Sequence, residues 1–280
     1  MNKKITTVIL IIVLLIGFSL LLYPTVSDKW NSYRLSKVIL NYSKAVEELS
    51  EEDYSEMLLR AQSYNSALLE NASRFELDDA EMKEYKSQLD VTGHGEIGYI
   101  EIPKIGVSIP IYHTTDPDIL QFAVGHLPGS SLPVGGVGTH CVVSGHRGLP
   151  SAKLFSDLDR MKAGDTFTVN VLMECETYEV DKILTVDPDN TEPLAIDPDK
   201  DYFTLITCTP YGVNTHRLLV RGHRVATVED GNEAYFSSEA IQIEPTFVAP
   251  VVALPMLIVL FLVLLIGGRR RKRRQKLHEE

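Results

Sequence analysis

Three side chains from separate segments of the sequence could together carry out thiol-based acyl transfer. Cys208 ends an apolar, β-branched run that Pro210 must terminate, so its thiol stands beside a loop, where a nucleophile can meet a substrate. A thiol needs an imidazolium or a fixed positive charge nearby to ionise at neutral pH. Arg217 begins the next apolar run, and a hairpin return between the two runs would bring its guanidinium beside the sulfur.

The basic partner of the thiol could be His146, His216 or another of the eight histidines. His146 follows an apolar run and is flanked by Gly145 and Gly148, which would let a polypeptide substrate approach the imidazole closely. Taken singly, each candidate also has a plainer interpretation. Histidines are commonly solvated or hydrogen-bonded in loops, and Cys208 could be a small buried strand residue.

The elements that must position these residues are short strands. After residues 93–95 the apolar pattern changes from a period near 3.6 to a period near 2, which is typical of strands. Strands are predicted around residues 99–102, 107–111, 140–144, 167–171, 178–180, 202–208 and 218–222. Turn signals separate them at residues 116–118, 133–136, 163–165 and 187–190. Seven or eight short strands within about 130 residues predict a sandwich or a closed barrel.

Helices are predicted in the segment before the strands. Apolar residues recur at helical spacing over residues 28–49 and again over 54–68, which predicts an amphipathic helical hairpin. A third helix is predicted over residues 78–89, with Asp78 or Asp79 as its amino-terminal cap. Residues 71–77 are then a loop between helices.

Two uncharged apolar runs are long enough to cross a bilayer as helices, residues 5–23 and 247–268. Lys3 and Lys4 precede the first run, and a basic cluster follows the second within the tail 269–280, so both termini are expected in the cytoplasm and the central part outside the cell membrane. The first run exceeds the usual apolar length of a signal peptide and no small-residue cleavage site follows it. We therefore expect an uncleaved anchor.

The charge is distributed unevenly along the chain. Nine of the 27 basic and two of the 38 acidic residues lie in the two tails, which leaves the part between the spans near −18, although the whole chain carries −11. Such a balance argues against nucleic-acid binding. An odd number of cysteines, Cys141, Cys175 and Cys208, excludes a disulfide-stapled small fold. Cys141 and Cys175 could pair, but buried or idle thiols are the favoured interpretation.

Several strings of residues together resemble the sortases, and specifically the class C, pilin-polymerising sortases. The strings are His-Arg-Gly-Leu-Pro at 146–150, Thr-Leu-Ile-Thr-Cys-Thr-Pro-Tyr at 204–211, Asn-Thr-His-Arg-Leu-Leu-Val-Arg-Gly at 214–222, Ile-Pro-Lys-Ile at 102–105 and Gly-His-Leu at 125–127. The resemblance runs from about Ile97 to Arg224. Two membrane spans around an amino-terminal helical extension also resemble that class.

The resemblance implies a mainly β fold. We expect a closed sortase-type β-barrel of about eight strands over residues 96–224, preceded by a helical extension over 24–95, with a transmembrane helix on either side of this central part. Residues 225–246 are acidic and lack a clear period, so they are expected to tether the barrel to the second span. The implied partners are the lipid bilayer and pilin subunits with LPXTG-like sorting signals, and no nucleic acid.

The resemblance also implies the chemistry. Cys208 would attack the carbonyl between Thr and Gly of the sorting signal, His146 would act as acid and base, and Arg217 would steady the substrate or the developing oxyanion. A lysine amine of another pilin subunit would then resolve the acyl-enzyme. This mechanism requires no metal and no organic cofactor. Five residues near these three are candidates to line the substrate: Ser144, Gly145, Thr207, Thr209 and Tyr211.

One feature of the class is altered. Class C sortases usually cover the site with a lid that bears Asp-Pro followed by an aromatic residue, and here Ser73, Arg74 and Phe75 occupy that place. Phe75 could still plug the site, but Arg74 would repel Arg217 where an acid would attract it. The hypothesis is a more weakly latched lid, or a loop that is no lid and whose Phe75 merely packs against the barrel.

Other interpretations of the sequence remain open at this stage. The chain could be a sortase that attaches proteins to cell-wall peptide, or a non-catalytic pilus-associated adaptor. A papain-like hydrolase is disfavoured because its cysteine precedes its histidine in the chain, the reverse of the order here. The acidic segment 187–192 lacks the spacing of a calcium-binding EF-hand loop and is expected to be a solvated loop. His216 is expected to be structural or to lie at the rim, and His126 and His140 have no derivable role.

Overall fold

The computed structural model describes residues 3–227 of the chain. The predicted second span (247–268), the basic tail (269–280) and nearly all of the predicted tether (225–246) lie outside the described residues. The chain divides into two compact units, and the helical and β elements from Ser27 onward belong to the second. Each unit is described by itself.

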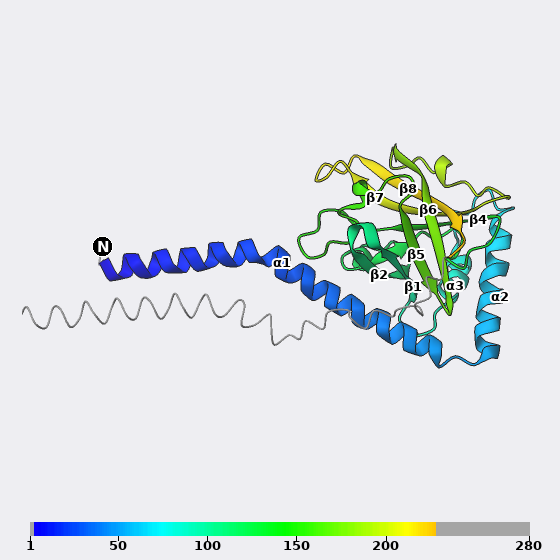
Figure 1. Cartoon of the computed structure of the whole chain (residues 1–280), viewed down its shortest axis with the longest axis horizontal. Coiled ribbons are helices and arrows are strands. Elements are labelled where there is room, and N and C mark those ends of the chain that lie inside the picture. The colour runs from blue at the N-terminus through cyan, green and yellow to red at the C-terminus, as the bar shows by residue number, and fades with distance from the viewer. Residues whose placement is uncertain (1–2, 228–280) are drawn as a thin grey trace, which may run out of the picture. The chain divides into compact units, whose positions relative to one another are not determined.

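A single long helix, α1 (Lys3–Glu47), opens the chain (Figure 1). The predicted anchor (5–23) and the predicted helix that starts near residue 28 are therefore one element, with Pro24 inside it. A proline within a helix removes one backbone hydrogen bond but need not end the helix. The apolar part has a mean hydropathy of 1.9 over an 18-residue window and leaves side chains such as Leu21 exposed, 79% in that case. These properties suit a membrane anchor.

Two shorter helices follow, α2 (Glu51–Leu68) and α3 (Asp79–Lys86). Ser50 caps α2 by accepting a hydrogen bond from the backbone N–H of Asp53, and acidic residues in the first turn favour the start of the helix. Asp78, not Asp79, caps α3, and Glu81 completes a capping box. The third helix ends three residues before the predicted Leu89, which has a left-handed φ of 55° that a helix cannot continue through.

Eight strands close into the predicted barrel, which excludes the sandwich. They are β1 (Glu96–Ile102), β2 (Val107–His113), β3 (Val124–His126), β4 (Thr139–Ser144), β5 (Thr166–Val171), β6 (Glu174–Val186), β7 (Asp201–Thr209) and β8 (His216–Val225). Their order around the barrel is β1-β2-β3-β4-β7-β8-β6-β5, and β5 pairs with β1 to close it. Only β3 was missed from the sequence, because three residues are too few to show an alternating pattern. A short helix, α4 (Pro117–Leu120), occupies one of the predicted turns.

Alternation along the strands separates an inner from an outer face. Phe203 and Leu205 of β7 belong to the main core, together with Phe167 of β5 and Val220 of β8. Ile206, which follows Leu205 and therefore points to the opposite face of β7, belongs to a second, smaller cluster. The barrel sheet is therefore apolar on both faces at this point, which means that something must cover its outer face.

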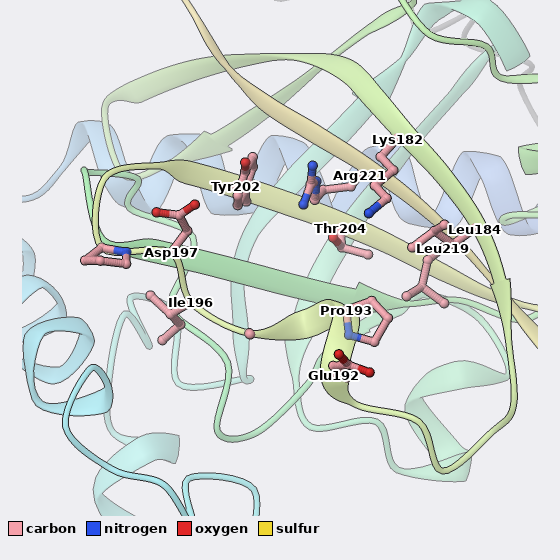
Figure 2. A pocket seen from close by; sticks show the side chains of 12 residues that line it. Lys182, Leu184, Glu192, Pro193, Ile196, Asp197, Tyr202, Thr204, Leu219 and Arg221 are labelled. Carbon is pink, nitrogen blue, oxygen red and sulfur yellow. The ribbon is translucent and has the colours of Figure 1, made fainter.

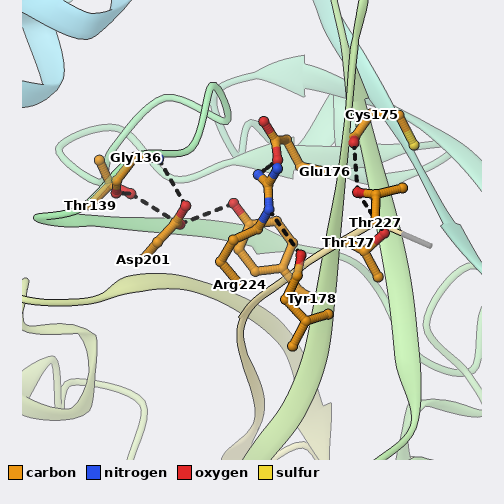
Figure 3. A network of polar contacts seen from close by, with 10 residues as sticks. Gly136, Thr139, Cys175, Glu176, Thr177, Tyr178, Asp201, Arg224 and Thr227 are labelled. Atoms are coloured by element: carbon orange, nitrogen blue, oxygen red, sulfur yellow. Dashed lines mark hydrogen bonds and ion pairs between the residues drawn. The ribbon is translucent and has the colours of Figure 1, made fainter. Parts of the chain in front are cut away.

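A polar network lies at the end of β7 far from Cys208 (Figure 3). The Asp201 carboxylate accepts hydrogen bonds from the backbone N–H of Gly136 (2.8 Å), from Thr139 Oγ1 (3.2 Å) and from the Tyr178 hydroxyl (3.1 Å). Burial raises the pKa of Asp201, and these hydrogen bonds oppose that rise. The network joins β4, β6 and β7 at one end of the barrel and leaves the opposite end for the site.

The helical extension is joined to the barrel through buried hydroxyl groups. The Tyr42 hydroxyl, on α1, donates to the carbonyl of Ile97 (3.1 Å) and accepts from the backbone N–H of Leu172 (2.9 Å). Tyr42 is 2% exposed, and its burial raises its pKa. The part of α1 that carries Tyr42 is thus an integral part of the β-barrel unit.

We expect Tyr42→Phe to lower the free energy of unfolding by about 1–3 kcal/mol, because it leaves the Leu172 N–H and the Ile97 carbonyl buried without this partner. The measurement is thermal unfolding of the detergent-solubilised full chain, followed by circular dichroism. Tyr33→Phe is the control, since the Tyr33 hydroxyl makes no hydrogen bond to any residue that the structure describes. Equal Tm values for the two variants would contradict the expectation.

Candidate active site

Cys208 and Arg217 lie directly opposite each other on neighbouring antiparallel strands, β7 and β8. Opposed residues of such a pair have Cβ atoms about 4.5–5.5 Å apart and point to the same face. Both side chains are half-buried. The Arg217 guanidinium donates to the carbonyls of His216 (3.2 Å) and Asn214 (3.4 Å), and no carboxylate among residues 3–227 pairs with it. Its charge is therefore available beside the sulfur.

The parallel pairing of β4 with β7 brings His146 to the same edge of the sheet. The last paired row is Ser144 with Ile206. Beyond it, the backbone N–H of Gly145 donates to the Ile206 carbonyl (3.0 Å). His146 and Cys208 each stand two residues past that row, so both lie where the two strands end. The His146 side chain is half-buried and has no hydrogen-bond partner among the described residues.

The loops that follow these strand ends also meet. The Arg147 guanidinium stands over the Tyr211 ring at 5.7 Å and forms an ion pair with Asp159 at 2.5 Å. Gly148 has a left-handed φ of 80°, and a Cβ on it would lie 2.9 Å from a Tyr211 ring carbon. The backbone of one loop is thus packed against an aromatic ring of the other, and only glycine fits at residue 148.

The structure places the five predicted substrate-lining residues differently. Ser144 is half-buried and pairs with Ile206 on the face of Cys208, whereas Thr209 is half-buried and alternates with Cys208 onto the opposite face; Tyr211 is exposed. Thr207 is 1% exposed and its hydroxyl donates to the carbonyl of Gly145 (2.8 Å). Since Thr207 alternates with Cys208, its side chain faces the other side of the sheet, where it is buried, and its contact with a substrate stays a prediction.

Gly145 has a steric reason to be glycine. It is buried, and a Cβ on it would lie 2.7 Å from a ring carbon of Phe155 and 2.9 Å from a methyl carbon of Val124. A side chain at this position would push the end of β4 away from its neighbours. Gly145 therefore serves the placing of His146 rather than contact with a substrate.

An apolar cluster on the outer face adjoins Cys208 and Arg217. Three of its members are buried, Val142, Leu194 and Leu219, and five more pack against them: Phe75, Leu127, Leu184, Val186 and Ile206. Ile206 and Leu219 are opposed in the β7–β8 register and stand two residues from Cys208 and Arg217 on the same face. This cluster did not emerge from sequence reasoning, although the apolar residues on both faces of β7 were a signal for it.

The loop 71–77 lies against this cluster. Phe75 is half-buried in it, and the Arg74 guanidinium stacks over the Phe75 ring at 4.4 Å. Arg74 donates to the carbonyls of Gly129 (3.1 Å) and Leu194 (2.7 Å), and burial lowers its pKa. The backbone N–H of Ser73 donates to the Asn71 side chain (2.9 Å). Arg74 thus anchors the loop through backbone carbonyls rather than through an acid paired with Arg217.

Two other histidines of the barrel, His126 and His140, make hydrogen bonds away from Cys208. His126 contacts the Tyr85 hydroxyl and the Ser131 carbonyl, both at 2.8 Å, and burial lowers its pKa to about 4. His140 contacts the Ala195 carbonyl (2.8 Å) and the Thr204 hydroxyl (2.7 Å), and burial likewise lowers its pKa to about 4. Both are therefore neutral structural residues at pH 7.

His216 lies at the rim of the barrel. It is half-exposed and faces Asp187 at 3.6 Å, as expected for a residue that alternates with Arg217. The two remaining cysteines are free: Cys141 is buried, which raises the pKa of its thiol, and Cys175 is exposed. No group of three or more metal-ligating side chains occurs in the described part of the chain, the acidic loop 187–192 included.

A cavity of about 700 Å³ extends the outer face beyond the apolar cluster (Figure 2). Leu184 and Leu219 belong to both, and the Arg221 guanidinium lies among the side chains around the cavity. Arg221 stacks on Tyr202 at 4.0 Å and is held by both oxygens of Asp181 (3.0 and 2.6 Å). On the outer face, the apolar cluster adjoins Cys208, and the more polar cavity around Arg221 follows it.

Comparisons with known proteins agree with this geometry. The family model described as "Sortase domain" matches residues 100–225. The crystal structure of sortase C1 from Streptococcus agalactiae is 51% identical, covers 68% of this chain and 98% of that chain, and superposes with a TM-score of 0.66. Sortase C from Streptococcus pneumoniae is 46% identical over 68% of this chain and 97% of that chain, with a TM-score of 0.62. Sortase D of Bacillus subtilis is 33% identical over 131 residues, which span 46% of this chain and 63% of that protein.

We expect Phe75→Ala to raise the rate at which a small methanethiosulfonate reagent labels Cys208 by about threefold or more, because the ring covers the apolar cluster beside the thiol. The measurement is labelling followed by intact mass in a Cys175→Ser background, which removes the exposed second thiol. Phe122→Ala is the matched control, since Phe122 is also half-buried but packs against the main core. Equal labelling rates in the two variants would show that Phe75 does not cover the site.

Proposed function

Since the chain belongs to the sortase family, we propose that it is a cysteine transpeptidase that cleaves an LPXTG-like sorting signal between Thr and Gly and transfers the acyl group to a lysine amine of another pilin subunit. The observation that carries the proposal is the register of three strands, which brings Cys208, His146 and Arg217 to one edge of the barrel. The solved relatives named sortase C support the class C assignment. The Streptococcus pneumoniae sortase C is described as having pilin substrate specificity, which supports pilins as the substrates.

In the first half-reaction the Cys208 thiolate attacks the threonine carbonyl carbon of the sorting signal. The carbonyl oxygen becomes an oxyanion, and the Arg217 guanidinium stabilises it because its charge lies opposite the sulfur and has no carboxylate partner in the described chain. His146, as imidazolium, protonates the leaving glycine amine, which otherwise departs poorly. A thioester between Cys208 and the threonine acyl group remains.

In the second half-reaction a lysine amine attacks the thioester. Neutral His146 accepts the proton of that amine, the bond between sulfur and the carbonyl carbon breaks, and an isopeptide bond forms. The Cys208 sulfur leaves as the thiolate that began the cycle. At the end of the cycle Cys208 is again a thiolate and His146 is again an imidazolium. The same imidazole therefore serves both half-reactions.

The apolar cluster receives the apolar residues of the sorting signal. Two of its members, Ile206 and Leu219, lie on the same face as Cys208, at the next pair of positions on that face. Leu and Pro of an LPXTG-like signal are the kind of side chains that such a surface desolvates favourably. Phe75 occupies part of this cluster, so the loop 71–77 must move aside for the substrate to bind and acts as a lid.

The membrane arrangement follows from the apolar helix. We propose that residues 5–23 of α1 anchor the chain in the bacterial cell membrane, that residues 247–268 form a second span, and that the catalytic barrel (96–224) lies outside with both termini in the cytoplasm. The exposed apolar side chains of α1 and the basic residues that flank both runs support this arrangement.

Cys208→Ala is expected to lower the rate of sorting-signal cleavage by more than about 10³-fold, since no other group can form the thioester. The assay uses the full chain in detergent micelles, a peptide with an LPXTG-like signal and a lysine-containing acceptor peptide, with products identified by mass spectrometry. Cys175→Ser is the matched control and is expected to keep the wild-type rate. Polymerised pilin in cells that carry only the Cys208→Ala enzyme would instead support a non-catalytic adaptor.

The nature of the product separates pilin polymerisation from attachment to the wall. We expect the lysine-containing pilin peptide to accept the acyl group in preference to a cell-wall peptide amine when both are offered at equal concentration. Mass spectrometry of the two conjugates measures the partition. A preference for the wall peptide would identify the chain as a wall-anchoring sortase with the same chemistry.

Thr207→Val is expected to lower the cleavage rate by about tenfold or more and to lower Tm as well, because it leaves the buried carbonyl of Gly145 without this partner and releases the residue next to His146. Thr207 is a positioning residue, so the loss should appear in kcat rather than in KM. The isosteric change Thr185→Val, at an exposed position of β6, is the control. A proportional rise in KM would show that Thr207 acts in substrate binding.

A further inference from the structure

A second cavity, of about 710 Å³, lies in the helical extension rather than on the barrel. It is enclosed by α2, by α3 with the residues that follow it, and by the loop 71–77. Its walls include aliphatic and aromatic surface from Leu59, Tyr64, Leu68 and Leu77. Leu59 is 62% exposed, so part of this apolar surface faces solvent. A ligand with an apolar stem would find contacts here.

Acidic side chains outnumber basic ones around the cavity. Glu52 and Glu56 come from α2, and Glu81 and Glu84 come from α3. Two basic residues also line it: Arg60 of α2, which donates to the Ser87 hydroxyl (3.1 Å), and Arg74, whose guanidinium is held by two backbone carbonyls. The pKa of Tyr64 is raised to about 12, chiefly by burial and further by Glu84 and Glu81. The cavity therefore favours a positively charged ligand and repels an anion.

A buried acceptor in the wall has no partner. Gln88 lines the cavity and is 4% exposed, and its side-chain oxygen makes no hydrogen bond to any residue in the described range. The backbone carbonyl of Gln88 is occupied, since it contacts His113 Nε2 at 2.8 Å. A buried side-chain oxygen is normally hydrogen-bonded, so the Gln88 side chain offers a free acceptor to a donor that enters the cavity.

We propose that this cavity binds the lysine side chain of a basic segment on a protein partner. The aliphatic stem would lie against Leu59, Tyr64 and Leu68, as lysine stems commonly lie on apolar surface. The ammonium group would donate to the Gln88 oxygen and be attracted by the carboxylates of Glu81 and Glu84. A metal ion fits less well, because no three ligating side chains converge in the described residues.

The cavity shares a wall with the lid. Asn71, Arg74 and Leu77 line it, and Phe75 of the same loop packs against the apolar cluster beside Cys208. A bound lysine would therefore touch the segment that covers the active site. The binding itself needs no catalysis and is expected to persist in Cys208→Ala, so its failure and a failure of the proposed reaction can be told apart.

The test is isothermal titration calorimetry with N-acetyl tetralysine amide as the probe and the full chain in uncharged dodecyl maltoside micelles at 0.15 M salt. Glu81→Gln with Glu84→Gln is expected to weaken binding by about tenfold or more. Glutamine can still close the capping box of α3, so the helix is retained. Asp189→Asn with Asp199→Asn makes the same change in net charge at exposed positions away from the cavity and is expected to alter binding less than twofold.

Gln88→Met removes the unpartnered oxygen with little change in volume. It is expected to weaken binding severalfold without lowering Tm, because the wild-type oxygen has no partner to lose. If this variant does not fold, the two glutamate changes alone decide the matter. Absence of measurable binding, equal weakening by the two charge-matched pairs, or unchanged affinity in a folded Gln88→Met variant would each overturn the proposal.

Discussion

The site depends on one constraint, the parallel pairing of β4 with β7 up to the last residue of β4. A parallel pair ends both strands at one edge, and here the hydrogen bond from Gly145 to Ile206 carries the pairing one residue past the last paired row. The Thr207 hydroxyl then holds the Gly145 carbonyl from the inner side. Residues 62 positions apart in the chain are thereby brought to neighbouring positions, with a nucleophile on one strand and an imidazole on the other.

The antiparallel pairing of β7 with β8 adds the positive charge in a different way. Opposed residues share a face, so the register alone places Arg217 beside Cys208. Because the arginine contacts only backbone carbonyls in the described chain, its charge is not neutralised locally. The site thus contains a positive charge without a buried ion pair. Burying an acid beside Arg217 would add the desolvation cost of a second charge.

Much of this arrangement could be predicted from the sequence, for physical reasons that differ between elements. Strands with several alternating residues were predictable because burial of one face imposes period 2. β3 was not, since a strand of three residues is determined by its neighbours. The burial of Thr207 on the face opposite to Cys208 was not predictable, because proximity in sequence does not tell which face a side chain occupies until the register is known. The apolar cluster around Leu219 could not be predicted, because the sequence does not tell which segment covers the outer face of the barrel.

In the loop 71–77, Ser73 and Arg74 take the place of the expected Asp-Pro, and Phe75 still packs against the apolar cluster. The expected repulsion between Arg74 and Arg217 presupposed that the side chain at residue 74 faces the active site. Instead the guanidinium is buried against two backbone carbonyls and presses on the ring of Phe75. Desolvation makes this burial costly, and carbonyl contacts and ring stacking offset part of that cost. Under the proposed function, these contacts are the ones that must break each time a substrate enters.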